Sequence, residues 1–402
     1  MTTNTIPVAG RPTPPVAAPR LSAEPRRSAA RMIGLDLARA LAVIGMFYAH
    51  VGRKQEFVLL DASTWDGIVV GRSSALFVIL SGLGLGLMTR GRTGDALATR
   101  RREIVYRGVF LFFVGGVLVT LGVHISIILA TYAVLFWLAL PLFSLSRRAL
   151  VAVAVGAALV GPFANAAAVA LITRFGDPDA EFSKLLATGN YPVLIWIAYL
   201  AAGIAIGRLA LDSRDTARRM LAAGAALMLA YPVAWVLGAI TGTVFDGFGA
   251  VVTAGGVPAA GDADRDAWGW AWSDAYRYLG AQPHSGTQLE IIGNIGFALT
   301  LIGTCLLVGA AAPRLFAPIA RMGRMSLSLY CLHIAAVFVL LHTVQDSRQE
   351  AWLETDWRGT AMWLAFTVGA FVFATLWFRT RSAGPLEGIM RRLPTLLENR
   401  GR

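Results

Sequence analysis

Apolar runs of about twenty residues recur along most of the chain, separated by short polar or arginine-rich segments. A helix of about 20 residues crosses the hydrocarbon core of a bilayer, so each run is long enough to span a membrane. Backbone amides inside lipid have to be paired within the protein, and the alternating pattern of a transmembrane barrel is absent, so the runs are predicted to be helices. The sequence therefore predicts an all-α, polytopic membrane helix bundle.

We expect about ten transmembrane helices. Their approximate ranges are 32–51, 68–88, 103–122, 125–145, 149–172, 190–211, 217–241, 289–312, 323–343 and 359–379. Residues 1–30 are rich in proline, alanine and arginine and lack the apolar centre of a signal peptide, which predicts a disordered cytoplasmic tail. The bundle is assigned to 31–385, with an outer loop at 242–288, and 386–402 is expected to form a cytoplasmic C-terminal segment.

The segments that connect the predicted helices alternate between the two sides of the membrane, and positive charge is distributed unevenly between these sides. Most of the 36 lysine and arginine residues fall on the side that includes both termini. Because positive residues concentrate in cytoplasmic loops, both termini are predicted to be cytoplasmic, with the protein in the plasma (inner) membrane. This clustering also accounts for the net charge of +12, and no basic block with interleaved aromatic residues predicts a nucleic-acid partner.

The cysteines and the outer tryptophans have simpler interpretations. Cys305 and Cys331 lie inside apolar runs, which predicts buried thiols rather than a disulfide, and no metal site is expected. Trp268, Trp270 and Trp272 of the outer loop either lie at the lipid interface, where indoles are enriched, or form a platform on which sugars stack.

The first apolar run contains three polar residues, Asp36, Arg39 and His50. A charged side chain at the centre of a bilayer costs about 2.5–3.5 kcal/mol on insertion scales and normally faces a bundle interior or a water-filled path. Asp36 lies one turn before Arg39 and can pair with it. Arg39 and His50 lie about 20° apart around the helix axis and about 16 Å apart along it. An ion pair with a capping histidine would be structural, but a shared face favours a functional stripe.

Other polar residues interrupt later apolar runs. They are Arg72 and Ser73 in GRSSALFVILSG, His284, Glu290 and Asn294 in PHSGTQLEIIGNIG, and Tyr330 and His333 in GRMSLSLYCLH. Arg72 can clamp a carboxylate, a phosphate or a developing oxyanion. Gly82, Gly84 and Gly86, which follow in the same run, predict close packing between helices.

Several of these stretches resemble a known family. GLDLARALAVIGMFYAH, followed by GRSSALFVILSG, resembles the heparan-alpha-glucosaminide N-acetyltransferase-like membrane family of bacteria. PHSGTQLEIIGNIG, GRMSLSLYCLH and GPLEGIMRRL resemble the domain-of-unknown-function 418 part of the same proteins. The resemblance covers about 31 to 395. The arginine, ten residues and histidine from Arg39 to His50 also resemble the first helix of the acyltransferase-3 membrane proteins.

The resemblance implies a ten-helix bundle in which an acyl group passes from cytoplasmic acyl-CoA to an acceptor across the membrane, typically a glycan hydroxyl or amine. Acetyl-CoA or another acyl-CoA would be a co-substrate, with no tightly bound cofactor. His50 would act as general base. Arg72 and Ser73 would orient the acceptor or stabilise the oxyanion. Asp36 and Arg39 would shape the cytoplasmic route of the donor.

Tyr330 and His333 would line the same channel, and His284, Glu290 and Asn294 would bind substrate in its outer vestibule. In the lysosomal enzyme of this family the active-site histidine lies in the loop after the first helix, whereas GRKQEFVLLDASTWDG contains none. Either the histidine of the first helix is the base itself, or the chain has a related but different function.

The expected partners are acyl-CoA, a cell-envelope glycan or lipid-linked acceptor and the lipid bilayer, and the sequence is compatible with a homodimer. Two other classes of function stay open. The polar stripe could serve a small-metabolite or proton-coupled transporter, although no clear inverted repeat is present. A non-catalytic binding or sensory protein is the third interpretation, but no soluble output domain is attached.

Overall fold

The computed structural model describes residues 24–53, 61–123, 125–240, 283–343 and 356–400. Within these residues the chain forms helices and no strand, which confirms the all-α prediction. The longer helices are α1 (Glu24–Val51), α2 (Arg72–Thr89), α3 (Gly94–Val119), α5 (Arg147–Phe175), α7 (Val193–Gly207), α8 (Arg214–Met228), α10 (Gln288–Ala311), α12 (Ser326–Thr343), α14 (Asp356–Trp377) and α15 (Pro385–Arg400). The shorter elements are η1 (Ala62–Val69), α4 (Leu129–Leu138), η2 (Pro141–Ser144), α6 (Glu181–Ser183), η3 (Lys184–Thr188), α9 (Ala230–Ile240) and α11 (Pro313–Arg324).

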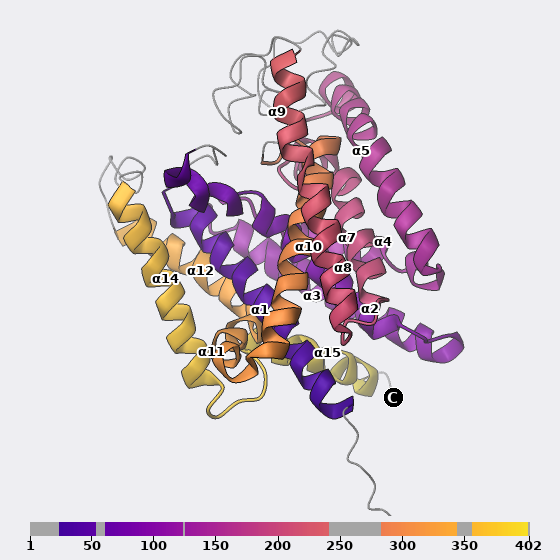
Figure 1. Cartoon of the computed structure of the whole chain (residues 1–402). Helices are drawn as coiled ribbons and strands as arrows, with labels where there is room; N and C mark the ends of the chain where they lie inside the picture. Colours follow the sequence, from indigo (N-terminus) through magenta and orange to yellow (C-terminus); the bar gives the residue numbers. More distant parts are fainter. Residues whose placement is uncertain (1–23, 54–60, 124, 241–282, 344–355, 401–402) are drawn as a thin grey trace, which may run out of the picture.

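The helix α1 runs through the middle of the bundle, where it packs on α10 and α11 (Figure 1). Its residues Ala38, Ala40 and Ala42 are fully buried, because small side chains let the neighbouring helices approach closely. The helices α5 and α14 lie on opposite flanks of the bundle (Figure 1). The first residues of α1 and the last residues of α15 lie at the same end of the bundle (Figure 1).

Five helical segments are long and apolar enough to cross a membrane. They are Met32–Val51, Ala62–Thr89, Arg147–Phe175, Gln288–Ala311 and Trp357–Trp377. The number rises to seven if two bent pairs each count as one span. These pairs are Glu181–Thr188 with Val193–Gly207, bent by 60°, and Pro313–Arg324 with Ser326–His342, bent by 64°. The predicted count of about ten spans is therefore not confirmed.

Three expected spans, at 103–122, 125–145 and 217–241, do not meet these limits of length and composition. The first corresponds to α3, whose N-terminal half carries several charged side chains. The second contains α4, which has only 10 residues. The third is divided between α8 and α9. An apolar run in a sequence does not show where a helix breaks, so the predicted ranges do not each correspond to one long apolar helix among the described residues.

Glycines bring α2 and α7 into close contact. Gly82 and Gly86 of α2 lie against Gly203 and Gly207 of α7, and a methyl group on either α2 glycine would overlap with a backbone carbonyl of α7. This arrangement confirms the predicted close packing. Gly84, from the same run, points toward the side chain of Arg39 in α1 instead.

Glu387 of α15 holds the first turn of α12. Its Oε1 accepts hydrogen bonds from the backbone N–H groups of Leu327, at 2.8 Å, and Ser328, at 3.1 Å. Its Oε2 accepts from the Ser328 hydroxyl at 2.5 Å. The first N–H groups of a helix have no partner within the helix, and a carboxylate placed there stabilises its positive end. The acidic residue of GPLEGIMRRL thus fixes where α12 begins.

The remaining predictions concern the cysteines and the loops. Cys305 and Cys331 are free, and Cys305 is buried, in agreement with the interpretation as thiols inside the bundle. The tryptophans of the outer loop, Trp268, Trp270 and Trp272, lie outside the described residues, as does most of the expected tail at 1–30.

Candidate active site

Asp36 and Arg39 of α1 form an ion pair, as the sequence predicts. Arg39 Nη1 lies 2.7 Å from Asp36 Oδ1, and the Asp36 side chain is almost completely buried. The neighbouring helix α11 closes over this turn, because Gly323 lies directly against the Asp36 carbonyl group. The positive charge of Arg324 also acts on the Asp36 carboxylate. The acid is therefore paired with Arg39 and lies against the last turn of α11, near the arginine-rich end of α1.

His50 of α1 and His333 of α12 are in direct contact. His50 Nδ1 lies 2.8 Å from His333 Nε2, and the two rings are within 8° of parallel. A hydrogen bond between two imidazoles needs a donor nitrogen on one ring and an acceptor nitrogen on the other. The pair therefore shares one proton across the contact, and either ring can hold it.

Aromatic rings surround the buried member of this pair. His333 is 3% exposed, and its ring centroid lies 5.1 Å from that of Phe47 and 5.2 Å from that of Tyr330. The Tyr330 hydroxyl accepts a hydrogen bond from the backbone N–H of Ile128 at 3.4 Å, at the start of α4. Tyr330 and His333 thus lie next to each other on α12, and their place in one channel stays a prediction. His50 is half-buried, so it is the more accessible of the two imidazoles.

A second polar cluster is built around Arg72 at the start of α2. Arg72 Nε donates to the Tyr231 hydroxyl at 3.0 Å, and its guanidinium lies over the Tyr231 ring, 4.4 Å from the centroid. The Tyr231 hydroxyl donates to Asn294 Oδ1 at 2.9 Å, and Asn294 Nδ2 donates to the Tyr199 hydroxyl at 3.0 Å. This chain of bonds connects α2, α9, α10 and α7. We call it, together with Glu290, the arginine–glutamate network.

Glu290, one turn before Asn294 on α10, binds the segment that leads into its own helix. Its Oε1 accepts from the backbone N–H of His284 at 2.8 Å and from Asn294 Nδ2 at 3.3 Å. Its Oε2 accepts from the backbone N–H of Gly286 at 2.6 Å and from the Ser285 hydroxyl at 3.2 Å. Two bonds to each oxygen account for the acceptor capacity of a carboxylate. Glu290 therefore fixes the shape of the segment before α10.

His284 takes part in this cluster mainly through its backbone. Its φ of 64° lies in the left-handed region, which only few non-glycine residues adopt. Its ring contacts Tyr191, with centroids 5.4 Å apart, and Trp196, at 6.5 Å. Burial lowers the pKa of the His284 imidazole, and a hydrogen bond with the backbone of Asn190 acts in the opposite direction. The ring thus lies among aromatic side chains, and its burial favours the neutral form.

Ser73, which the sequence groups with Arg72, lies in a different environment. Its hydroxyl donates to the carbonyl of Val69 at 2.8 Å. The side chain packs against Gly45 of α1, where a Cβ atom would collide with the serine hydroxyl. In this arrangement Ser73 lets α1 and α2 approach each other, and it is not bonded to the arginine–glutamate network.

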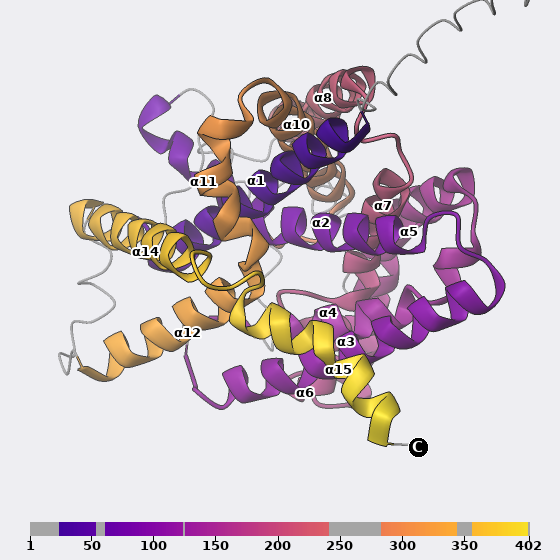
Figure 2. The same cartoon turned by 90° about the horizontal axis from the view of Figure 1, so that it is seen from below.

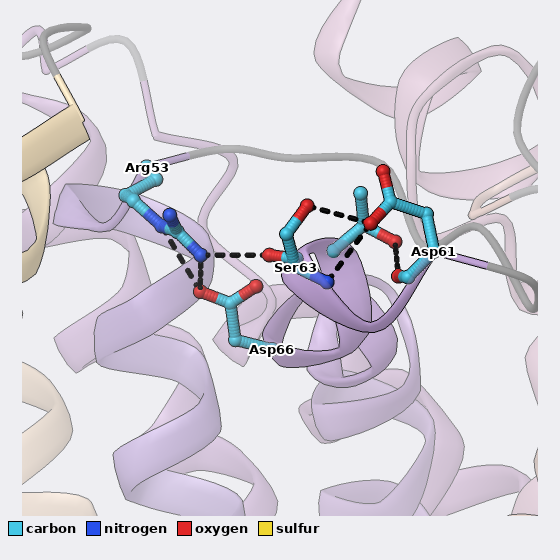
Figure 3. Close-up of polar contacts among 5 residues, drawn as sticks. Arg53, Asp61, Ser63 and Asp66 are labelled. Carbon is cyan, nitrogen blue, oxygen red and sulfur yellow. Dashed lines mark hydrogen bonds and ion pairs between the residues drawn. The ribbon is translucent and has the colours of Figure 1, made fainter.

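The end of α1 beyond His50 is tied to η1 by charged side chains (Figure 3). Arg53 Nη2 donates to Asp66 Oδ2 at 2.6 Å and to the carbonyl of Ser63 at 3.0 Å. Asp61 Oδ1 accepts from the backbone N–H and the hydroxyl of Ser63, at 3.0 and 2.7 Å. These hydrogen bonds from Ser63 lower the pKa of the Asp61 carboxyl group. The cluster fixes the position of α1 three residues beyond the histidine.

Sequence reasoning missed two members of the arginine–glutamate network, Tyr199 and Tyr231. Both lie in strongly apolar stretches, IWIAYLAAG and MLAYPVAW, where their hydroxyl groups are the polar atoms to be satisfied. A buried tyrosine hydroxyl usually finds a hydrogen-bond partner, and this was the signal that could have identified them.

Comparison with known proteins gives the family. Residues 31–241 match a family model described as heparan-alpha-glucosaminide N-acetyltransferase, catalytic. The chain belongs to this family. Residues 266–396 match a second model, described as a protein of unknown function (DUF418). No curated protein matches the chain.

Membership in the heparan-alpha-glucosaminide N-acetyltransferase family supports a membrane N-acetyltransferase-like activity in a multi-pass membrane protein. His50 lies in the first matched region and His333 in the second, so their contact joins the two regions. Arg72 and Glu290 are divided between the regions in the same way. The further likeness to acyltransferase-3 proteins, based on the spacing from Arg39 to His50, stays a prediction.

Proposed function

We propose that this protein transfers an acetyl group from acetyl-CoA on the cytoplasmic side to a hydroxyl or amine of an acceptor, such as a glycan, on the other side of the membrane. The observation that carries the proposal is the contact between His50 and His333 inside a bundle that belongs to an N-acetyltransferase family. An imidazole is suited to proton transfer near neutral pH, because its unperturbed pKa is about 6.5.

In the proposed reaction His50 is the general base, since it is the more accessible ring of the pair. It accepts the proton of the acceptor hydroxyl or amine while the acceptor oxygen or nitrogen attacks the carbonyl carbon of the thioester. The carbon–sulfur bond breaks, and the CoA thiolate takes the proton from the histidine pair. The products are the acetylated acceptor and free CoA. His333 holds the orientation of His50 and shares its proton.

The other clusters are assigned to the two ends of the route. The ion pair of Asp36 and Arg39 lies toward the arginine-rich end of the bundle, and we assign it to the passage of the pantetheine arm. Arg72, Asn294 and Glu290 belong to a cluster at the opposite end of the bundle, and we assign that cluster to the acceptor side. Since most of its atoms are already bonded to one another, it would shape the acceptor site rather than take part in proton transfer.

The test uses the purified full-length protein in lipid nanodiscs with radiolabelled acetyl-CoA as donor and glucosamine as amine acceptor. We expect acetylated product and release of CoA with wild type, and rates about 10²–10⁴-fold lower with His50→Ala, since this is the usual contribution of a general base. His342→Ala is the matched control, because His342 is an exposed histidine on the same helix as His333. Equal rates for wild type and His50→Ala would exclude His50 as the base.

The same preparation distinguishes the enzyme from the transporter predicted as the alternative. In proteoliposomes, uptake of a solute driven by a pH gradient and independent of acetyl-CoA would support transport. Acetylation of glucosamine that stops when acetyl-CoA is omitted would support transfer. Label that stays on the protein after rapid denaturation in SDS at neutral pH would replace direct transfer with an acyl-histidine step at the same pair.

A further inference from the structure

An apolar groove opens on the outside of the bundle, away from the histidine pair. It has a volume of about 560 Å3 and lies between α3, α12, α14 and the start of α15. Its lining includes Val114 and Leu118 of α3, Ala335 of α12 and Phe373 of α14. Leu332, also in the lining, is 50% exposed, as lipid-facing side chains are in a membrane protein. The groove therefore has the chemistry of a site for a hydrocarbon chain.

The helix α3 connects this groove to a cluster of arginines. Arg100, Arg107 and Val114 follow one another at intervals of seven residues. Seven residues are just under two turns of a helix, so the three side chains lie on one face, with a rise of about 10 Å from each to the next. The face that lines the groove at Val114 therefore continues to Arg107 and then to Arg100, toward the arginine-rich end of the bundle.

The C-terminal helix adds a third arginine to this cluster. The helix α15 packs against α3 and α12 and crosses the lower end of the bundle (Figure 2). The positive charge of Arg391 on α15 acts on Arg107, as does that of Arg100. Glu103 supplies a negative charge, but its carboxylate lies 2.6 Å from Arg100 Nη1. The three arginines of this cluster thus outnumber its one carboxylate, which is paired with Arg100, and this leaves an excess of positive charge at the end of the groove.

Within the described part of the chain, the guanidinium of Arg107 is incompletely bonded. Its Nη1 lies 3.3 Å from the sulfur of Met88, which is a weak acceptor. Its Nε is buried and has no hydrogen-bond partner among the described residues. Buried charged groups are normally paired and hydrogen-bonded, because an unpaired one is costly. An anion bound here would supply both the missing acceptor and the missing negative charge.

We propose that this face binds an anionic phospholipid, with an acyl chain in the groove and the phosphate at Arg107, Arg100 and Arg391. A soluble phosphate compound such as CoA fits less well, because the amides of its pantetheine arm would find almost no polar partner in the groove. The bilayer also supplies anionic lipids at the basic face of a membrane protein, where each arginine strengthens their binding.

The test measures binding of a fluorescent phosphatidylglycerol to the delipidated full-length protein in detergent, with phosphatidylcholine as the uncharged comparison. We expect phosphatidylglycerol to bind at least about tenfold more tightly. Arg107→Gln and Arg391→Gln should each weaken its binding about fivefold. Arg148→Gln is the matched control, because Arg148 is an exposed arginine at the start of α5, and it should leave the affinity unchanged.

A variant that fills the groove tests the acyl chain separately. Ala335→Phe should weaken phosphatidylglycerol binding. Inorganic phosphate needs only the arginines, so its weak competition with the lipid should be the same in the variant and in wild type. The proposal is overturned if the two lipids bind equally, or if Arg391→Gln, a substitution at an exposed position, behaves like the control. It is also overturned if CoA competes as well as phosphatidylglycerol and Ala335→Phe has no effect, because the site would then serve a soluble phosphate.

Discussion

Two polar clusters lie inside the same apolar bundle, and they differ in how their atoms are bonded. The histidine pair is one contact of 2.8 Å between two titratable rings, His50 and His333, on helices far apart in the sequence. The arginine–glutamate network contains a carboxylate with four hydrogen bonds and a chain of bonds from Arg72 through Tyr231 to Asn294. One cluster is a pair of titratable rings, and the other connects four helices.

The hydrogen bonding of a polar cluster inside a membrane bundle indicates whether the cluster serves mainly structure or proton transfer. A saturated network has to lose an existing bond before it can bind a substrate, so its main effect is on structure. The hydrogen bond between two imidazoles can form with either ring as the donor. The pair can therefore change which ring holds the proton without losing the bond. We therefore expect substitutions in the histidine pair to affect catalysis first and substitutions in the network to affect stability first.

The largest expected effect is on the reaction, through His333. His333→Ala removes the ring that orients His50 and shares its proton, so kcat/KM for glucosamine acetylation should fall about 10²-fold or more. His333→Gln keeps a hydrogen-bonding group next to His50 but cannot take up a proton, so it should restore only a small part of the rate. The measurement is the pH profile of kcat/KM in both variants. A profile identical to wild type would show that His333 is only a packing residue.

Glu290→Gln tests the other side of the comparison. The amide group of glutamine turns two acceptor positions into donors, which face the N–H of Gly286 or of His284. Loss of hydrogen bonds to a charged group should lower the free energy of unfolding by about 1.5–3 kcal/mol. The measurement is unfolding in mixtures of SDS and mild detergent. Glu181→Gln is the matched control, because Glu181 is an exposed glutamate that lies 3.4 Å from Lys184. It should lower the free energy of unfolding by less than about 1 kcal/mol.

The outcome of this second substitution can contradict the comparison directly. If Glu290→Gln abolished acetylation while the stability stayed at the wild-type value, the network would be catalytic and the division between the two clusters would be wrong.

The sequence predicted much of the candidate site, because titratable groups inside apolar runs are rare enough to be selected individually. That argument predicts His50, Arg72 and His333. The sequence could not show that His50 meets His333, since 282 residues lie between them and the contact depends on how α12 packs. Spacing along one helix was informative for Asp36 and Arg39, because both partners lie on the same helix.

The fold was predicted less completely. Hydropathy identifies helices, so the all-α bundle is confirmed. Hydropathy does not show a bend of 64° between α11 and α12, or the break between α8 and α9, because these depend on tertiary contacts. The environment of Ser73 also depends on tertiary contacts that hydropathy does not show. Its neighbour Arg72 is bonded to the network, while the serine packs on α1.

A smaller effect is expected where helix packing supports the network. Gly82→Ala places a methyl group against the backbone of α7, so α2 and α7 have to separate and Arg72 moves with α2. Overpacking of this kind should lower the stability by about 1–3 kcal/mol. Gly84→Ala, on the same helix, is the matched control. Its Cβ would lie 3.9 Å from Arg39 Nη2, an ordinary contact, so the stability should change little. Equal losses in both variants would show that packing on α7 does not decide the result, because the gain in helix propensity from glycine to alanine should stabilise both.

The smallest effect concerns His284, at the edge of the network, and its pH dependence. Burial lowers the pKa of His284 below the value of about 6.5 that a histidine has in the unfolded chain. As the pH falls below about 6.5, the unfolded chain therefore takes up a proton that the folded protein does not, and the stability decreases. The contribution of one such group is at most about 1.4 kcal/mol per pH unit.

Asparagine tolerates a positive φ and does not titrate, so His284→Asn should make this decrease at acid pH less steep. At neutral pH the variant should be slightly less stable, because the ring contacts with Tyr191 and Trp196 are lost. The measurement is the free energy of unfolding at several values between about pH 7.5 and 5.5. His342→Asn, at an exposed position, should follow the wild-type curve. If His284→Asn also followed it, the acid sensitivity would come from other groups, and the histidine pair would be the next to examine.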